Sequence, residues 1–215
     1  MHHALGELAS NMAYVGGATV SLYRDRPAAD SRFTEDVDVV VELATYRDFA
    51  DLEDSLRKRG FVNDIGSGII GRYTIGFITV DIMPTHADVL GFTNPWYSSG
   101  FAHSIAYPID DDTVVRIFDA PHFLATKLAA FKNRGRGDGR TSPDFEDIVY
   151  VLNNRGAVWD ELTLSPEPVR DFIGKSFAEL LSTKHLYEWV SVHLEPYERQ
   201  RIDSIIMGLT RFSNQ

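Results

Sequence analysis

The sequence predicts an α+β fold, because strand-like patterns fill the first half of the 215-residue chain and helical patterns fill the second. Up to about residue 118, short apolar runs with a period of two alternate with glycine turns. Longer amphipathic segments follow, and several begin with a proline in the first helical turn, as at Ser142-Pro143. We therefore predict an α/β domain over residues 1–119 and a helical domain over residues 120–215.

The first half contains the strand signals in a clear order. A helix over 3–11 precedes a brief strand, "AYV", which stops at Gly16-Gly17, and "ATVSLY" then continues as a helix. Thr45 is a suitable N-cap and Gly60 a suitable stop for a helix between them. Strands are expected at 33–43, 61–65, 68–75, 77–84 and 113–118, and the aromatic-rich stretch 84–112 reads as irregular.

The second half reads as a series of helices. "HFLATKLAAF" follows Asp119 and Pro121, and "DFEDIVYVL" follows Ser142-Pro143. A third helix is expected to begin near Ser165, and "PYERQRIDSIIMGLTRF" forms another near the end.

Composition limits the class of protein. Hydrophobic residues make up 44% and charged residues 24% of the chain, which is an ordinary globular balance. The absence of cysteine excludes disulfides and thiolate metal sites, and no apolar run reaches the ~20 residues of a membrane span. The first ten residues lack the basic start and apolar core of a signal peptide, so we expect a cytoplasmic protein. The net charge of −10 argues against unspecific nucleic-acid binding.

Three acids occur where apolar residues are expected. Asp36 and Asp38 share one face of the strand "DVDVVV", and Asp81 interrupts the apolar strand "FITVDIMP". A strand-end cap or a solvated strand face would explain each acid separately. If the three converge, however, they repel one another unless cations lie among them, and Mg²⁺ is the ion that a few carboxylates and substrate phosphates hold.

Gly16-Gly17 and Lys127 are candidates for binding phosphate. A glycine pair before a helix lets a phosphate approach the backbone, although a simple tight turn also explains it. Lys127 falls within the apolar stripe of its helix, so its ammonium either reaches out to solvent or points to a phosphate.

Acids and cations also occur in and before the next helix. Asp144 and Asp147 share a face with apolar residues, and a first-turn acid such as Asp144 also suits the helix dipole. The Gly/Arg-rich loop Lys132 to Arg140 reads as a solvated loop or as one that touches substrate phosphates.

Taken in order, "YVGGATVSLY", "RFTEDVDVVV", "VDIMP", "HFLATKLAAF" and "DFEDIVYVL" resemble the nucleotidyltransferase superfamily, and most closely its AbiEii/AbiGii-type toxin branch. The resemblance covers roughly residues 10–155. It departs from the pattern in two places: glycine replaces the usual serine after the first glycine, and "PAADS" lengthens the connection from Gly17 to Asp36.

The resemblance implies a nucleotidyltransferase-like mixed sheet and roles for the candidate residues. Asp36, Asp38 and Asp81 would bind two Mg²⁺ ions, with Mn²⁺ as an alternative, and Asp81 would also serve as the base. The remaining candidates would bind the nucleotide: Gly16, Gly17, Lys127, Asp144 and Asp147.

The implied activity is transfer of a nucleoside monophosphate from an NTP to an acceptor hydroxyl, with release of pyrophosphate. The toxin-like resemblance favours tRNA or another RNA as the acceptor, and a cognate antitoxin protein as a partner. Two alternatives stay open: a nucleotide-sensing or partner-binding protein without catalysis, and a small-molecule nucleotidyltransferase of the aminoglycoside type.

Overall fold

The computed structural model describes residues 1–134 and 137–214, which form two compact units. The first contains residues 1–19 and 33–119, and the second contains residues 20–32 and 120–215. The segment 20–32 belongs to the helical unit because its groups bond there. The ring of Tyr23 stacks on Phe123 with 4.4 Å between centroids, and Asp25 accepts a hydrogen bond from the amide of Gly156.

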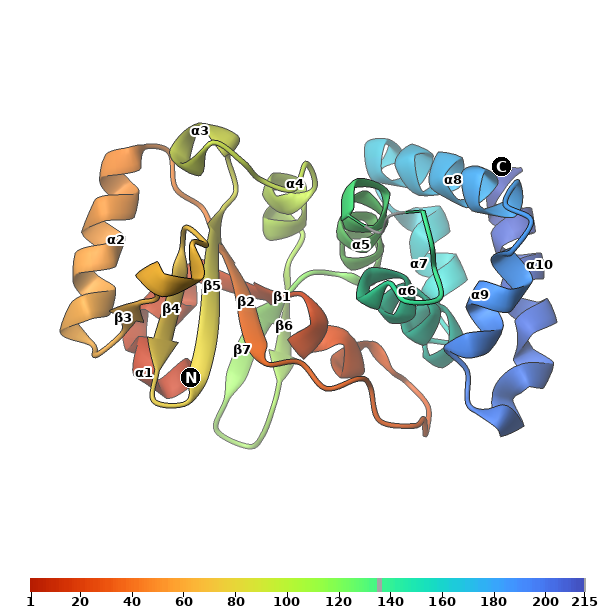
Figure 1. The fold of residues 1–215 in the computed structure, drawn as a ribbon, viewed down its shortest axis with the longest axis horizontal. Coiled ribbons are helices and arrows are strands. Elements are labelled where there is room, and N and C mark those ends of the chain that lie inside the picture. The colour runs from red at the N-terminus through yellow and green to blue at the C-terminus, as the bar shows by residue number, and fades with distance from the viewer. Residues whose placement is uncertain (135–136, 215) are drawn as a thin grey trace. The chain divides into compact units, whose positions relative to one another are not determined.

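A mixed seven-stranded sheet organises the first unit, in the order β3-β4-β5-β2-β1-β7-β6 (Figure 1). β2 is parallel to β5 and β1 to β7, and the remaining pairs are antiparallel. The predicted α+β class is confirmed. The strands are β1 (Met12–Val15), β2 (Asp36–Val41), β3 (Val62–Asn63), β4 (Arg72–Ile75), β5 (Ile78–Pro84), β6 (Ile105–Pro108) and β7 (Val114–Ile117).

Helices cover both faces of this sheet. Thr45 caps α2 in a reciprocal capping box with Asp48, as the sequence predicts, and Glu53 of α2 accepts a hydrogen bond from Tyr73 of β4 at 2.8 Å. On the opposite face, Phe101 of α4 packs with Val40 of β2. The α-helices are α1 (His2–Leu5), α2 (Tyr46–Lys58), α3 (Ala87–Leu90) and α4 (Tyr97–Ala102), and 3₁₀ helices span Gly6–Asn11, Gly17–Tyr23 and Ile65–Ser67.

The interpretation of residues 84–112 as irregular is wrong, because α3, α4 and β6 all lie there. β6 is an edge strand that pairs only with β7 within the described sheet, and most of its residues are exposed. An edge strand of this kind carries no alternating burial pattern, so periodicity does not reveal it.

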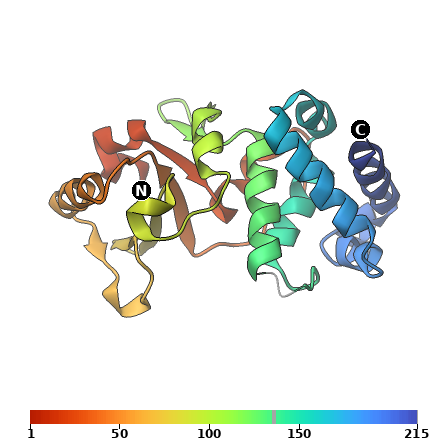
Figure 2. The same ribbon diagram turned by 90° about the horizontal axis from the view of Figure 1, so that it is seen from above.

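The second unit is a helical bundle in which α5 packs against α6, α7 and α8, and α10 packs against α8. Figure 2 shows α5 and α8 side by side. Ser142 caps α6 by accepting from the amide of Phe145, as predicted, and α7 precedes the helix expected near Ser165. The bundle contains α5 (Ala120–Arg134), α6 (Pro143–Asn154), α7 (Val158–Leu164), α8 (Glu167–Leu181), α9 (Leu186–Val192), a 3₁₀ helix (Pro196–Arg201) and α10 (Ile202–Ser213).

Across the described ranges 1–134 and 137–214, no helix has both the length and the apolar character needed to cross a membrane.

Candidate active site

The register of the sheet brings the three predicted acids together on one face. Asp38 of β2 lies directly opposite Asp81 of β5, and Arg72 of β4 lies opposite Asp81 on its other side. Asp36 precedes Asp38 by two residues and so points to the same face. Asp81 is a mid-strand residue, followed by Ile82–Pro84, rather than a strand-end cap. Three carboxylates and one guanidinium therefore share a small area of the sheet.

Arg72 pairs with two of these acids at once. Its Nε lies 2.7 Å from Asp81 Oδ1, and its Nη2 lies 2.6 Å from Asp81 Oδ2 and 3.3 Å from Asp36 Oδ2. The hydrogen bond to Asp81 raises the pKa of Arg72 further above its usual value, although partial burial opposes this. Because both acids reach one nitrogen atom, Asp36 Oδ2 and Asp81 Oδ2 lie close together, and convergence of all three acids on one ion stays a prediction.

Asp38 lies against the glycine turn. Gly16 has a positive φ of 73°, and a Cβ at this position would overlap the carboxylate of Asp38. The hydroxyl of Thr19 donates to the carbonyl of Gly16 at 3.0 Å and so closes the turn. Gly17 is buried and opens the 3₁₀ helix that follows. Gly16 is thus required for the tight approach of a site acid, while contact of Gly16 and Gly17 with phosphates stays a prediction.

The donor set suits a divalent cation in kind, since three carboxylates on one face match the oxygen ligands that Mg²⁺ takes. Both oxygens of Asp81, however, already accept hydrogen bonds from Arg72. No group of three or more His, Cys, Asp or Glu side chains is arranged to hold a metal ion anywhere in residues 1–134 and 137–214. The metal site therefore stays a prediction, and Arg72 is the group that a metal would have to displace.

The second unit places Lys127 between Asp144 and Asp147. The ammonium nitrogen lies 2.6 Å from Asp147 Oδ2 and 3.4 Å from Asp144 Oδ1. Only 5% of Lys127 is exposed, so the alternative in which its ammonium reaches solvent is wrong. Lys127 belongs to the second unit and the three acids to the first, so a cleft common to them stays a prediction.

Two arginines extend this network toward the surface, since the side chain of Arg134 is mostly exposed and that of Arg32 partly so. Arg134 forms a bidentate pair with Asp144 at 2.8 and 2.9 Å, and Arg32 pairs with Asp147 at 2.9 and 3.2 Å. Burial opposes ionisation of Asp144, but the hydrogen bonds from Arg134 and the charge of Lys127 outweigh it and hold the pKa of Asp144 below its usual value. Three cations and two carboxylates therefore contact one another in this network.

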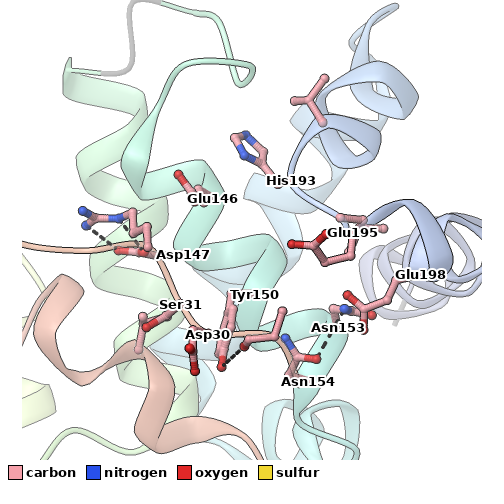
Figure 3. A pocket seen from close by; sticks show the side chains of 15 residues that line it. Asp30, Ser31, Glu146, Asp147, Tyr150, Asn153, Asn154, His193, Glu195 and Glu198 are labelled. Atoms are coloured by element: carbon pink, nitrogen blue, oxygen red, sulfur yellow. Dashed lines mark hydrogen bonds and ion pairs between the residues drawn. The ribbon is translucent and has the colours of Figure 1, made fainter. Parts of the chain in front are cut away.

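Asp147 also borders a cavity of about 280 Å³ in the second unit (Figure 3). Figure 3 shows the acidic side chains Asp30, Glu146 and Glu195 around it. Among the described residues that line this cavity, Arg32 is the one arginine or lysine. Such a lining repels phosphates. Asp147 therefore serves here as a counter-ion of Lys127 and Arg32, and its role toward a nucleotide stays a prediction.

The Gly/Arg-rich loop lies partly outside the described residues, because Gly135 and Arg136 are not among them. Lys132 pairs with Glu179 at 2.7 Å, and Arg140 pairs with Asp138 at 2.7 Å. These two cations have acidic partners in the helical unit, and contact with substrate phosphates stays a prediction.

Sequence reasoning missed Arg72 and Arg32, and it did not predict the pairing of Arg134 with Asp144. Arg72 carries a weak signal, since it is a charged residue at the start of a strand whose neighbour, Tyr73, is fully buried. Arg32 lies in a polar loop 115 residues before its partner Asp147, and nothing local predicts that pairing.

Comparisons with known proteins do not identify a family for this chain. The chain matches no model of a protein family, and no curated protein sequence matches it significantly.

Proposed function

We propose that the protein is a metal-dependent nucleotidyltransferase that moves a nucleoside monophosphate from an NTP to an acceptor hydroxyl. The observation that carries this proposal is the convergence of Asp36, Asp38 and Asp81 on one face of a mixed sheet, with Asp38 pressed against the Gly16 turn. Carboxylates that cluster in this way repel one another unless a cation lies among them; Arg72 pairs with two of the three, and the proposed Mg²⁺ would take over that role. We further propose that the sheet has the nucleotidyltransferase-like arrangement and that the protein works in the cytoplasm.

The chemistry assigned to the site is an in-line displacement. The acceptor oxygen forms a bond to the α-phosphorus as the bond to the α–β bridging oxygen breaks, and pyrophosphate leaves. Asp81 accepts the proton of the acceptor hydroxyl. Asp36, Asp38 and Asp81 would hold Mg²⁺, which supplies neutralisation of the charge that develops on the phosphoryl oxygens. The residues themselves provide position and electrostatic complementarity rather than a covalent intermediate.

Binding of the nucleotide is assigned to the glycine turn and to the buried lysine. Gly16 and Gly17 allow the triphosphate close to the backbone. Lys127 is the cation that we assign to the phosphates, and in the structure its ammonium pairs with Asp144 and Asp147.

The acceptor is sought with α-labelled NTPs. The protein is incubated with each NTP, Mg²⁺ and either total cellular RNA or an aminoglycoside, and the label on the acceptor is counted against Asp38→Asn. The proposal predicts metal-dependent label on one class of acceptor, with tRNA as the expected one, and none with Asp38→Asn. Equal labelling by both proteins would remove Asp38 from the mechanism.

A second candidate is a nucleotide-sensing or partner-binding protein that performs no catalysis. The bidentate pairing of Arg72 with Asp81 favours it, because a carboxylate that accepts on both oxygens is a poorer base and a poorer metal ligand. Tight, metal-dependent NTP binding without turnover on either class of acceptor is the outcome that distinguishes it.

A further inference from the structure

We propose that Arg72 is an internal competitor of the metal: its guanidinium occupies the oxygens of Asp81 and Asp36, and once displaced it binds the phosphates of the incoming nucleotide. This inference rests on the proposed function and deepens it, because it assigns to one residue both the affinity for metal and the capture of the triphosphate.

Competition follows from the contacts. Arg72 forms a fork with both oxygens of Asp81 at 2.7 and 2.6 Å and extends to Asp36 Oδ2 at 3.3 Å. A divalent cation coordinated by Asp81 needs one of the two oxygens that Arg72 occupies, and at Asp36 it meets Arg72 at Oδ2. Two cations on the same oxygens repel each other, so the guanidinium and the metal exclude each other at this point.

The backbone around Arg72 is fixed, so the side chain alone is free to move away. Gly71 has a positive φ of 83°, its carbonyl accepts from the amide of Ile82 at 2.8 Å, and a Cβ on it would overlap the carbonyl of Ile82. On the other side, Tyr73 is fully buried and hydrogen-bonded to Glu53. The side chain of Arg72 is 20% exposed and carries several rotatable bonds.

Displacement leaves the guanidinium beside the ligand. Its base stays at the start of β4, directly across from Asp81, so a rotamer change moves the cation only a few ångströms. A planar guanidinium binds phosphate oxygens in the same two-pronged way as it binds a carboxylate. Arg72 is therefore expected to oppose metal binding in the absence of nucleotide and to favour binding of the metal–nucleotide complex.

These opposite effects provide the test. Mn²⁺ alone is titrated calorimetrically into wild-type protein, Arg72→Met and Arg57→Met, and α,β-methylene analogues of the common NTPs are then titrated at saturating Mn²⁺. Arg57→Met is the matched control, because Arg57 lies in the same unit, pairs with the exposed Asp54 on α2 and removes the same charge.

For Arg72→Met we expect the Kd of Mn²⁺ to fall about tenfold, equivalent to about 1.4 kcal/mol. The Kd of the nucleotide analogue should rise by a similar factor. Arg57→Met should leave both constants within about twofold of wild type, since long-range charge effects are screened.

Other outcomes overturn the inference. If Arg72→Met binds Mn²⁺ no more tightly than wild type, Arg72 is a structural ion pair or an organiser of the acids. If Arg72→Met fails to fold, Arg72→Lys decides in its place: its single ammonium cannot form the fork, so tighter Mn²⁺ binding than wild type supports competition and equal or weaker binding refutes it. Asp38→Asn separates this inference from the proposed function. If Asp38→Asn binds Mn²⁺ as tightly as wild type does, Asp38 is not a metal ligand, and the proposed metal site is wrong whatever Arg72 does.

Discussion

Replacement of Lys127 by methionine tests the buried network in the helical unit. The sequence alone predicts little loss of stability, because methionine keeps most of the packing of the lysine stem. The structure changes this expectation: the ammonium lies 2.6 Å from Asp147, and the two side chains are 6% and 1% exposed. Removal of one partner from a buried pair costs about 3–5 kcal/mol, because the remaining charge is buried without compensation.

The neighbouring arginines reduce this cost. Asp147 keeps Arg32 and Asp144 keeps Arg134, so we expect Lys127→Met to lower the free energy of unfolding by about 3 kcal/mol, the lower end of that range. The assay is urea unfolding at pH 7.

Lys132→Met is the matched control, since the same substitution on the same helix removes an exposed pair with Glu179, and it should cost at most about 1 kcal/mol. If the loss of stability arises from the uncompensated charge of Asp147, the double variant Lys127→Met/Asp147→Asn should be more stable than Lys127→Met alone. The reasoning is refuted if Lys127→Met loses no more than Lys132→Met.

Two further predictions concern the glycine turn and acid stability. Gly16→Ala should displace the carboxylate of Asp38 and abolish transfer, whereas Gly60→Ala, which has a similar φ of 88° and nothing within 4 Å of the new Cβ, should cost only about 1–2 kcal/mol in stability and leave transfer unchanged. Equal activity in both variants would show that Asp38 needs no glycine beside it. Because the pKa of Asp144 is lowered, against burial, by Arg134, its contribution to stability is present above about pH 4 and is lost as pH falls through the folded-state pKa. The difference in urea midpoint between wild type and Asp144→Asn should therefore be larger at pH 7 than at pH 3, and an unchanged difference would contradict this assignment.

Local signals account for the parts of the fold that the sequence predicts correctly. Thr45 and Ser142 cap their helices through side chains that bond within three residues, and a glycine pair ends β1. The two acids of "DVDVVV" share a face because strand alternation is a local property. Each of these features is decided by residues close together in the chain.

The remaining features depend on pairing between distant segments. Arg72 meets Asp36 because the strand order places β4, β5 and β2 side by side, and composition gives no sign of that order. In the same way, Tyr23 and its neighbours join the helical unit through contacts with residues more than 90 positions away, beginning with Phe123. The edge strand β6 could not be predicted for a different reason: most of its residues are exposed, so they show no alternation of apolar and polar positions.

The central claim is that Asp36, Asp38 and Asp81 support metal-dependent nucleotidyl transfer, and a paired-label experiment tests it most directly. Wild-type protein and Asp38→Asn receive the same NTP labelled on either the α- or the γ-phosphate, together with Mg²⁺ and cellular RNA. The account predicts that wild type places α-label, and no γ-label, on the acceptor in a one-to-one ratio with pyrophosphate released, and that Asp38→Asn, with its fold intact by circular dichroism, places none. Transfer of γ-label, or equal transfer of α-label by the two proteins, would contradict it.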